Sequence, residues 1–182
     1  DKFNILSKED KNEIKLINKL KPMSINFVKK IREEIIKSNT IGKYEWYMLG
    51  SYIRKESFIN DIDILIVNGD IKDFFNNVLK KKFNLIHVLR SGDLMLSAIF
   101  SYNNVYFQID LIYSTTEDKY TQQLYFTGSK TFNIYLRHVA KELGYKLNQY
   151  GLYKNDKKIK LSSEEDIFKI LKIKYIEPFK RV

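Results

Sequence analysis

The sequence predicts an α+β fold, in which helices flank a mixed sheet and a small subdomain of helices and a hairpin follows at the carboxyl-terminal end. Two observations predict it. Apolar residues recur at helical spacing in the first 36 residues and again after residue 117. Between residues 46 and 113 the spacing changes to the alternation and short apolar runs typical of strands. A chain of 182 residues can bury a core as one domain or as two small subdomains.

Two helices are expected first. Ser7 can cap a helix running to about Leu20, and Ser24 can cap a second one through Ile36. We expect both to act as scaffold. The second helix carries five apolar side chains spaced for burial, which are Phe27, Val28, Ile31, Ile35 and Ile36.

The middle of the chain predicts a sheet. The elements expected in order are a strand over 46–49, a strand over 62–67, a helix over 71–80 capped by Asp70, and strands over 83–89, 94–102 and 105–113. Asn103-Asn104 joins the last two strands, because Asn tolerates the positive φ of a tight hairpin turn.

The last third predicts helices and a hairpin. The elements expected are a helix after Glu117 ending at 127–129, a helix from Ser129 to Leu143 ended by Gly144, a hairpin of 146–153 and 159–161 around Asn155-Asp156, and a short helix with Ser162 and Glu165 as its capping box. The helix after Ser129 has an expected core stripe of Phe132, Leu136, Val139 and Leu143. Asn133, Arg137 and Lys141 share another face, for which a solvated surface is the simpler interpretation.

Composition limits the function. The chain has no cysteine, which excludes disulfides and thiolate metal sites and favours a reducing, intracellular compartment. No apolar run approaches the roughly 20 residues that span a bilayer, so we expect no membrane partner. The net charge is +10, and residues 130–182 hold 13 basic and 6 acidic side chains. This basic third suits a polyanion, although charge alone slightly favours a lysine-rich solubilising surface.

Three carboxylates indicate chemistry. Asp61 and Asp63 lie two apart at the start of a predicted strand, so both point to one face and repel one another. A shared proton, a basic partner or divalent cations would offset this repulsion. Asp110 lies between Ile109 and Leu111 in a later strand, where an acid is costly to bury unless it is paired or binds metal. Oxygen ligands suit Mg²⁺, with Mn²⁺ as a substitute, and two ions roughly 4 Å apart would support phosphoryl transfer.

A phosphate site is expected beside these carboxylates. Gly50 lets the backbone approach an anion, Ser51 offers a hydroxyl, and Arg54 one turn later can reach the same anion. The alternative is a capped turn before a strand that happens to begin with acidic residues. Asp110 favours the functional interpretation.

These residues resemble a known family. Gly50-Ser51, Asp61-x-Asp63 and Asp110 on a later strand resemble the polymerase beta-like nucleotidyltransferases. The segment Y-F-T-G-S at 125–129, opening a helix, is similar to that of the family X DNA polymerases. The resemblance runs from about Leu49 to the carboxyl terminus, and the segment 147–152 is similar to one in a minimal viral member.

The resemblance implies a role for each matching residue. Asp61, Asp63 and Asp110 would hold two Mg²⁺ ions and be catalytic. The incoming nucleotide would be bound by Gly50, Ser51, Arg54, Asn60, Tyr125, Phe126, Gly128 and Asn133. DNA would be contacted by Arg137, Lys141, Lys146 and Lys154. The implied reaction adds dNTPs to a primer 3′-end in gapped or nicked DNA during repair, by a monomer that hands its product to a DNA ligase.

The resemblance also implies domains. Residues 1–113 would form the catalytic palm and residues 114–182 a subdomain that binds nucleotide and DNA. The segment before Trp46 is too short for the amino-terminal lyase domain of larger relatives, so no lyase activity is expected. The chain departs from the family pattern at three positions, with Asn60 before the first metal Asp, Lys130 after the Gly-Ser of the helix and Gln108 two before the third Asp.

Two other functions stay open. One is a nucleotidyltransferase that modifies protein, RNA or a small molecule, against which Tyr125 to Ser129, Asn133 and Arg137 argue. The other is a non-catalytic scaffold for DNA ends, in which the three carboxylates would have no purpose.

Overall fold

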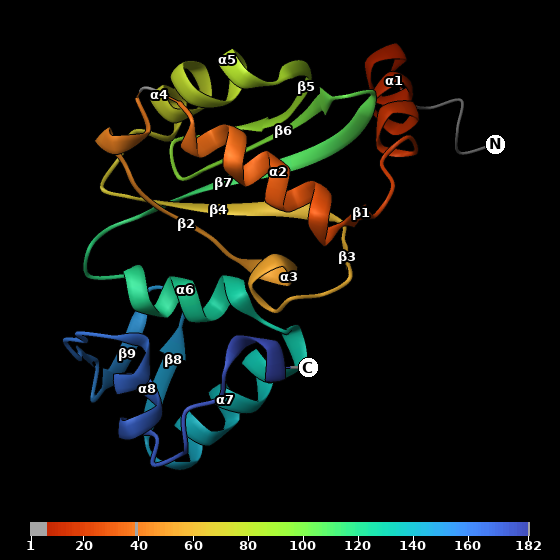
Figure 1. Ribbon diagram of the computed structural model, residues 1–182. Helices are drawn as coiled ribbons and strands as arrows, with labels where there is room; N and C mark the ends of the chain where they lie inside the picture. The colour runs from red at the N-terminus through yellow and green to blue at the C-terminus, as the bar shows by residue number, and fades with distance from the viewer. Residues whose placement is uncertain (1–6, 39, 182) are drawn as a thin grey trace.

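A computed structural model describes residues 7–38 and 40–181. Its main sheet and the helices around it form the upper part of Figure 1, and the carboxyl-terminal subdomain lies below. The sheet has five strands in the order β2 (Glu45–Met48), β4 (Asp61–Val67), β7 (Val105–Ser114), β6 (Met95–Tyr102) and β5 (Asn84–Ser91). Because β4 and β7 are parallel and the other neighbours antiparallel, the sheet is mixed, and the predicted α+β class is confirmed.

One face of this sheet is apolar. It packs against α2 (Ile25–Ile36) and against a helix made of α4 (Ile71–Phe74), a π-helical segment (Phe75–Leu79) and α5 (Lys80–Lys82). The strands contribute alternate side chains to this core, namely Ile62, Ile64, Ile66, Leu96, Ala98, Phe100, Phe107, Ile109 and Leu111. Since side chains alternate along a strand, Asp61, Asp63 and Asp110 project from the opposite face.

The amino-terminal helices differ in their packing. Ser24 caps α2 by accepting a hydrogen bond from Phe27 N, as predicted. Ile36 is 43% exposed, so its predicted burial is wrong: Ile35 takes the core-facing position, and the next residue points about 100° away.

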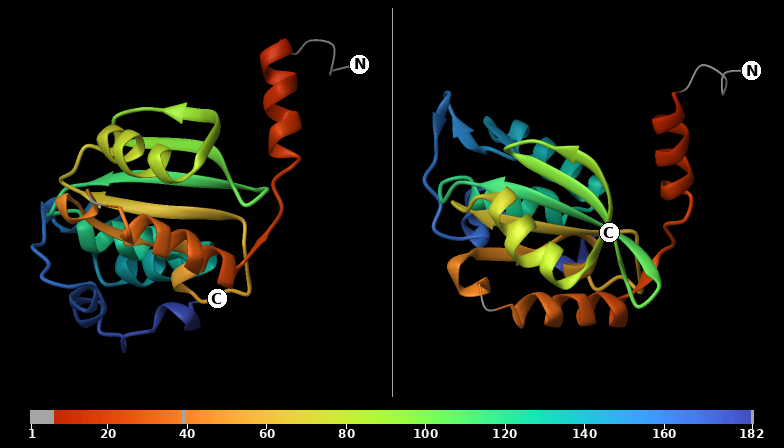
Figure 2. Two further views of the ribbon diagram at one scale, coloured as in Figure 1. Left: turned by 45° about the horizontal axis from the view of Figure 1, so that its top comes forward. Right: turned by 90° about the horizontal axis from the view of Figure 1, so that it is seen from above.

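Helix α1 (Lys8–Ile17) has the predicted Ser7 cap but ends before Leu20 and has no buried residue. It stands apart from the sheet in Figure 2 and meets strand β5 through Glu13 and His87, whose Oε2 and Nε2 lie 3.2 Å apart.

The predicted strands and turns between residues 45 and 114 agree with the structure to within a few residues. Asp70 caps α4 by accepting hydrogen bonds from Lys72 N and Asp73 N, and the helix continues to Lys82. Asn103 and Asn104 have φ of 50° and 62°, which confirms the predicted hairpin turn. Two-stranded pairing of β1 (Met23–Ser24) with β3 (Phe58–Ile59) was not predicted.

The carboxyl-terminal subdomain has its own core between α6 (Lys119–Thr127), α7 (Lys130–Glu142) and α8 (Glu164–Ile170). Ser129 caps α7 by accepting from Phe132 N, as predicted. Leu143 is exposed and Ala140 is buried in its place, because α7 ends at Glu142 and Ala140 continues the stripe of Leu136. The proposed boundary after residue 113 stays a prediction.

The predicted hairpin is wrong in its details. Segment 146–153 is not one strand, because β8 (Tyr145–Asn148) and β9 (Gly151–Lys154) pair around a turn closed by Tyr150 N donating to Asn148 Oδ1 at 2.8 Å. The third strand is β10 (Lys157–Lys158) rather than 159–161, although Asn155-Asp156 does form the turn. The capping box of α8 is Ser163 and Asp166, one residue later than predicted.

Short helical turns complete the described chain at η2 (Ile41–Lys43), α3 (Gly50–Ile53) and η4 (Pro178–Lys180). None of the helices in the described ranges is both long and apolar enough to cross a bilayer.

Candidate active site

The three predicted carboxylates share one end of the sheet. In the parallel pair of β4 and β7, Asp63 lies directly beside Asp110 and Asp61 beside Gln108. All four side chains are half-buried, and Gln108 Nε2 donates to Asp110 Oδ1 at 2.9 Å. The register of two strands far apart in the sequence therefore gathers the three acids on the face that the core leaves free.

Their charges are poorly compensated. Burial, and then the charges of Asp61 and Asp110, raise the pKa of Asp63 to about 8. Burial and the charge of Asp110 also raise the pKa of Asp61. The Arg54 guanidinium lowers the pKa of both groups but does not offset the other causes. A cation bound among these oxygens would supply the missing positive charge.

The donor set fits a hard divalent cation, since it consists of carboxylate oxygens with no thiolate. Within residues 7–38 and 40–181, no three His, Cys, Asp or Glu side chains converge on one metal position. Like charges gain nothing by converging unless a cation joins them. The argument for a divalent cation at Asp61, Asp63 and Asp110 therefore depends on their oxygen donors and on their uncompensated charge. It does not depend on ligands that already converge on one point.

Gly50 lies directly against the Asp63 carboxylate. It begins α3 with a φ of 63°, and a Cβ built on it would lie 2.1 Å from Asp63 Oδ2. Both the backbone conformation and the space therefore require glycine. The predicted close approach at Gly50 is made to a carboxylate of the site.

Gly50→Ala is expected to remove most nucleotide-transfer activity, because the new methyl group must push the Asp63 carboxylate aside. Gly144→Ala is the matched control: Gly144 also has a positive φ, of 75°, but no atom lies within 4 Å of its Cβ position. Both variants should lose stability by about 1 kcal/mol. Equal activity losses in the two variants would contradict the steric argument, and steady-state rates with unfolding curves distinguish the outcomes.

Arg54 joins the two parts of the chain. Its Nε donates to Glu56 Oε1 at 2.8 Å, and its Nη1 donates to the carbonyl of Thr127 at the end of α6. A Cβ on Gly128 would lie 3.1 Å from the same Nη1, so Gly128 allows this approach. The guanidinium therefore lies between the carboxylates and the segment 125–129.

The segment 125–129 closes one side of the site. Phe126 packs on Leu49, Leu65, Val67 and Ile112, on the sheet face that carries the carboxylates. The Tyr125 ring meets Phe126 edge-on with centroids 5.1 Å apart, and Asn133 Nδ2 donates to Tyr125 O at 2.7 Å. The peptide bond between Gly128 and Ser129 is cis. These predicted nucleotide residues are thus brought together.

Comparisons with known proteins agree with this geometry. Residues 122–182 match the family described as the DNA polymerase beta thumb. The chain is 32% identical over 139 residues to the repair DNA polymerase X of African swine fever virus (isolate Tick/South Africa/Pretoriuskop Pr4/1996), covering 74% of this chain and 79% of the viral protein. The chain belongs to the family X DNA polymerases. The family resemblance and the enzyme class, a DNA-directed DNA polymerase, are confirmed.

Other relatives widen the comparison. The DNA polymerase/3′-5′ exonuclease PolX of Bacillus subtilis is 29% identical over 129 residues, which cover 71% of this chain and 22% of that protein. A crystal structure of Leishmania infantum polymerase beta, titled as a ternary P/T complex, superposes with a TM-score of 0.79 at 22% identity. It covers 97% of this chain and 83% of the other, which shows a shared fold. The roles of individual residues in this family X polymerase stay predictions.

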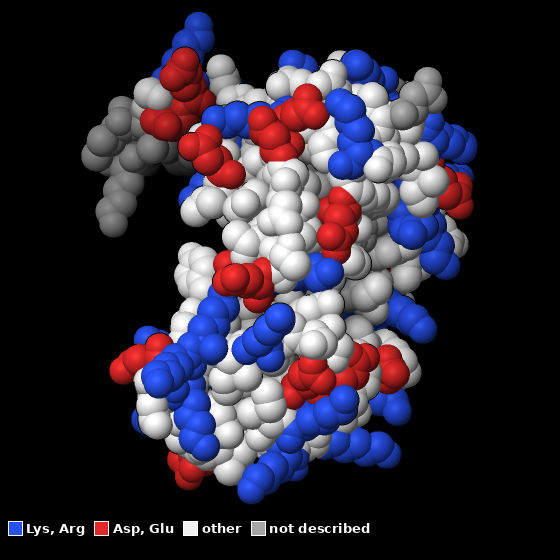
Figure 3. Space-filling view, turned by 90° about the vertical axis from the view of Figure 1, so that its left-hand side faces the viewer, with Lys and Arg blue, Asp and Glu red and all other residues white. Residues whose placement is uncertain are grey.

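The remaining predicted residues lie further out. Asn60 is exposed between β3 and β4, and Arg137 is exposed on α7, with its Nε 3.4 Å from Asn133 O. Lys141, Lys146 and Lys154 are exposed, and Lys154 Nζ lies 5.1 Å from the centroid of the Tyr145 ring. In Figure 3, Lys and Arg side chains lie on the carboxyl-terminal subdomain and also on the upper part, with Asp and Glu side chains among them, and a notch lies between the two parts at the left-hand edge.

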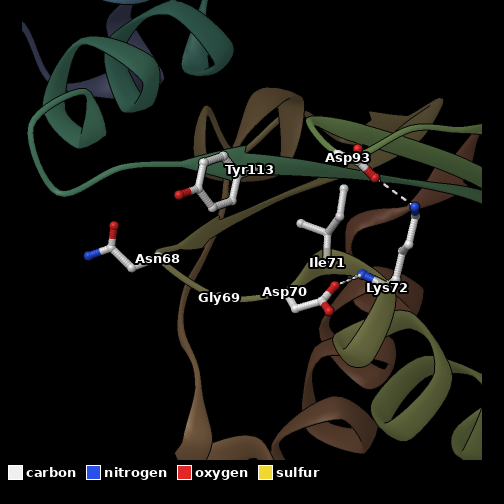
Figure 4. Close-up of a pocket in the computed structure, with 7 residues that line it drawn as sticks. All are labelled: Asn68, Gly69, Asp70, Ile71, Lys72, Asp93 and Tyr113. Carbon is white, nitrogen blue, oxygen red and sulfur yellow. Dashed lines mark hydrogen bonds and ion pairs between the residues drawn. The ribbon is translucent and has the colours of Figure 1, made fainter.

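A polar pocket lies at the far end of β4, away from the three carboxylates. It has a volume of about 410 Å³ and lies beside Asn68, Gly69, Asp70, Ile71, Lys72, Asp93 and Tyr113 (Figure 4). Its charges are already paired, since Lys72 Nζ lies 2.6 Å from Asp93 Oδ1 and Asp70 caps α4. The whole length of β4 separates it from Asp61, so it is not part of the active site.

Three residues with clear roles in the site were not predicted. Glu56 and the Thr127 carbonyl bind Arg54. Arg181 is fully buried and its carbonyl accepts from Ser129 N at 3.2 Å, at the start of α7. The contacts of Thr127 and Arg181 have no local signal, because they depend on segments that meet only in the folded chain. Glu56 lies two residues after Arg54, so this pair was visible in the sequence.

Proposed function

We propose that this family X polymerase fills short gaps in DNA during repair, adding a dNTP to a primer 3′-end and releasing pyrophosphate. The observation that carries the proposal is the gathering of Asp61, Asp63 and Asp110 on one sheet face beside the segment 125–129. The carboxylates supply a site for phosphoryl transfer, and the segment supplies a wall against which a nucleotide can lie.

Each group has a stated task in this reaction. Gly50, Ser51 and Arg54 form the triphosphate site, in which the Arg54 guanidinium and the Ser51 hydroxyl bind the anion. Gly50 leaves room for the Asp63 carboxylate beside them. Tyr125, Phe126 and Gly128 contact the sugar, with the aromatic pair held in place by packing. Asn133 contacts the base edge, and Asn60, between β3 and β4, completes the nucleotide site. Holding these groups in place before the reaction lowers its entropic cost.

The carboxylates hold the cations, for which we propose two Mg²⁺ ions, replaceable by Mn²⁺. Bound by these carboxylates, such ions would supply the positive charge that neutralises the phosphates and favours the deprotonated primer hydroxyl. We assign to Asp110, the strand neighbour of Asp63, a part in taking the hydroxyl proton. Gln108 Nε2 donates to Asp110 Oδ1 and helps to hold this carboxylate.

DNA contact is assigned to the basic subdomain. Exposed Lys141, Lys146 and Lys154 lie in the third of the chain with the largest positive excess. Each phosphate contact made by such a lysine should steepen the salt dependence of binding to gapped or nicked DNA. The filled gap is a nick, which is the substrate of a DNA ligase.

The test offers the protein several acceptors. Gapped duplex, nicked duplex, RNA and carrier protein are incubated with Mg²⁺ and each labelled dNTP or NTP. Extension of the gapped primer supports the proposal. Label transferred to RNA or protein alone would favour another nucleotidyltransferase, and DNA binding without transfer to any acceptor would favour a scaffold.

Arg137→Ala is expected to lower the efficiency of templated insertion about tenfold, because we assign contact with the template strand to this exposed guanidinium. Arg137 lies one helical turn after Asn133, with its Nε 3.4 Å from Asn133 O. Arg32→Ala is the control, since Arg32 is exposed on α2 on the opposite side of the sheet. The measurement is kcat/KM on a one-nucleotide gap, and equal values for Arg137→Ala and wild type would refute the role.

A further inference from the structure

Glu56 binds the guanidinium of Arg54, the group that we propose as a ligand of the triphosphate. Its Oε1 accepts from Arg54 Nε at 2.8 Å and from Arg54 Nη2 at 2.5 Å. The third guanidinium nitrogen, Nη1, donates to Thr127 O. Every nitrogen of Arg54 therefore already has an acceptor within the chain.

This occupation matters because arginine binds phosphate most strongly through two parallel N–H groups. The Nε and Nη2 groups form such an edge, and Glu56 covers it. A triphosphate can take this edge only if the carboxylate leaves. Glu56 can leave readily, since its side chain is 47% exposed, whereas that of Arg54 is 17% exposed and held by Thr127.

The charge of Glu56 also opposes triphosphate binding. A carboxylate bonded to Arg54 offsets the positive charge that a triphosphate needs, in a site that already contains three acids. Removing the Glu56 charge leaves Arg54 in place, because the hydrogen bond to Thr127 O still fixes Nη1. Loss of Glu56 should therefore strengthen nucleotide binding and not weaken it.

We propose that Glu56 competes with the nucleotide triphosphate for Arg54 and thereby sets the affinity of the polymerase for dNTPs. The inference rests on the proposed role of Arg54 as a triphosphate ligand. Each incoming nucleotide displaces the carboxylate, which rebinds Arg54 after pyrophosphate leaves.

The test measures the Kd of a matched dNTP with Mg²⁺ on a gapped duplex whose primer ends in a dideoxynucleotide, so that no turnover occurs. Glu56→Gln is expected to lower this Kd about three- to tenfold, the range of a half-exposed ion pair with two hydrogen bonds. Glu33→Gln removes the same charge from an exposed position of α2 and should leave the Kd unchanged. An unchanged or higher Kd for Glu56→Gln overturns the inference.

Arg54→Ala separates this inference from the proposed function. It should raise the Kd, and adding Glu56→Gln to it should change nothing more. If Arg54→Ala leaves the Kd unchanged, the assigned role of Arg54 fails and the inference fails with it. If Arg54→Ala weakens dNTP binding but Glu56→Gln does not tighten it, only the competition between Glu56 and the triphosphate is refuted. The competition is also refuted if the double variant binds the dNTP more tightly than Arg54→Ala alone. Thermal unfolding of each variant confirms that the chain is folded.

Discussion

Asp63→Asn is expected to stabilise the metal-free chain at pH 8 and to abolish its polymerase activity. Burial and the neighbouring carboxylates raise the pKa of Asp63 to about 8, so the folded chain holds a proton that the unfolded chain releases near pH 4. The folded state thus binds more protons between these values, and its stability falls as pH rises from about 4 to 8. The neutral amide of Asn avoids this loss of stability, because it does not ionise as the pH rises.

The expected gain is about 2 kcal/mol at pH 8, well below what the full pKa shift would give, because the three acids titrate together. Activity should fall on the order of 10³-fold, since an amide holds a divalent cation poorly. Thermal unfolding in a chelator at several pH values, with primer extension in Mg²⁺, measures both effects.

Asp93→Asn is the control for this experiment. Asp93 is exposed, and its hydrogen bond with Lys72 holds its pKa below the usual range. Stability from such a group is present above its unfolded pKa, so this variant should lose a little stability at pH 8 and keep its activity. A metal-free wild-type chain whose stability does not fall between pH 4 and 8 would contradict the pKa argument.

Arg181→Ala is expected to destabilise the carboxyl-terminal subdomain by about 3–5 kcal/mol, because it leaves the largely buried Glu164 carboxylate without a cation. Arg181 is completely buried, and its Nη2 lies 2.5 Å from Glu164 Oε1. Its Nε donates to Ile176 O at 2.8 Å, and its guanidinium lies 5.3 to 5.5 Å from the ring centroids of Phe132, Phe168 and Tyr175.

The double variant Arg181→Met/Glu164→Leu is the informative comparison. Replacing both partners by apolar residues of similar size is often close to neutral, so it should recover much of the stability lost in Arg181→Ala. Lys169→Ala removes an exposed cation that pairs with Asp166 and should change stability by less than about 1 kcal/mol. Urea unfolding followed by fluorescence measures all three, and a loss in Arg181→Ala no larger than in Lys169→Ala would contradict the role of the buried pair.

Short-range rules predicted much of this fold correctly. The caps at Ser7, Ser24, Asp70 and Ser129 and the Asn103-Asn104 turn depend on contacts within a few residues, which a sequence displays directly. The carboxylate site could also be predicted from the sequence. Alternation along a strand places Asp61 and Asp63 on one face, and an acid within an apolar strand is costly to bury unless it is paired or binds metal.

One failure was local: Asn148 and Gly151 flank the turn at Gln149-Tyr150, but segment 146–153 was interpreted as one strand. The other failures arise where distant segments decide the outcome. The apolar stripe of α1 did not show that no residue of this helix would be buried in the described part of the chain. Likewise, the pairing of Arg181 with Glu164 and of Arg54 with Thr127 joins residues separated by 17 and 73 positions. Such contacts depend on the packed chain and have no local signal.

Single-nucleotide extension of a gapped primer by wild type and by Asp110→Ala tests the central claim most directly. In the proposed function, the three carboxylates on one sheet face form the catalytic centre of a gap-filling polymerase. We expect Mg²⁺-dependent extension by the wild type that falls at least about 10³-fold in Asp110→Ala, while affinity for the gapped duplex changes little. Extension by Asp110→Ala at a rate close to that of wild type would contradict the account.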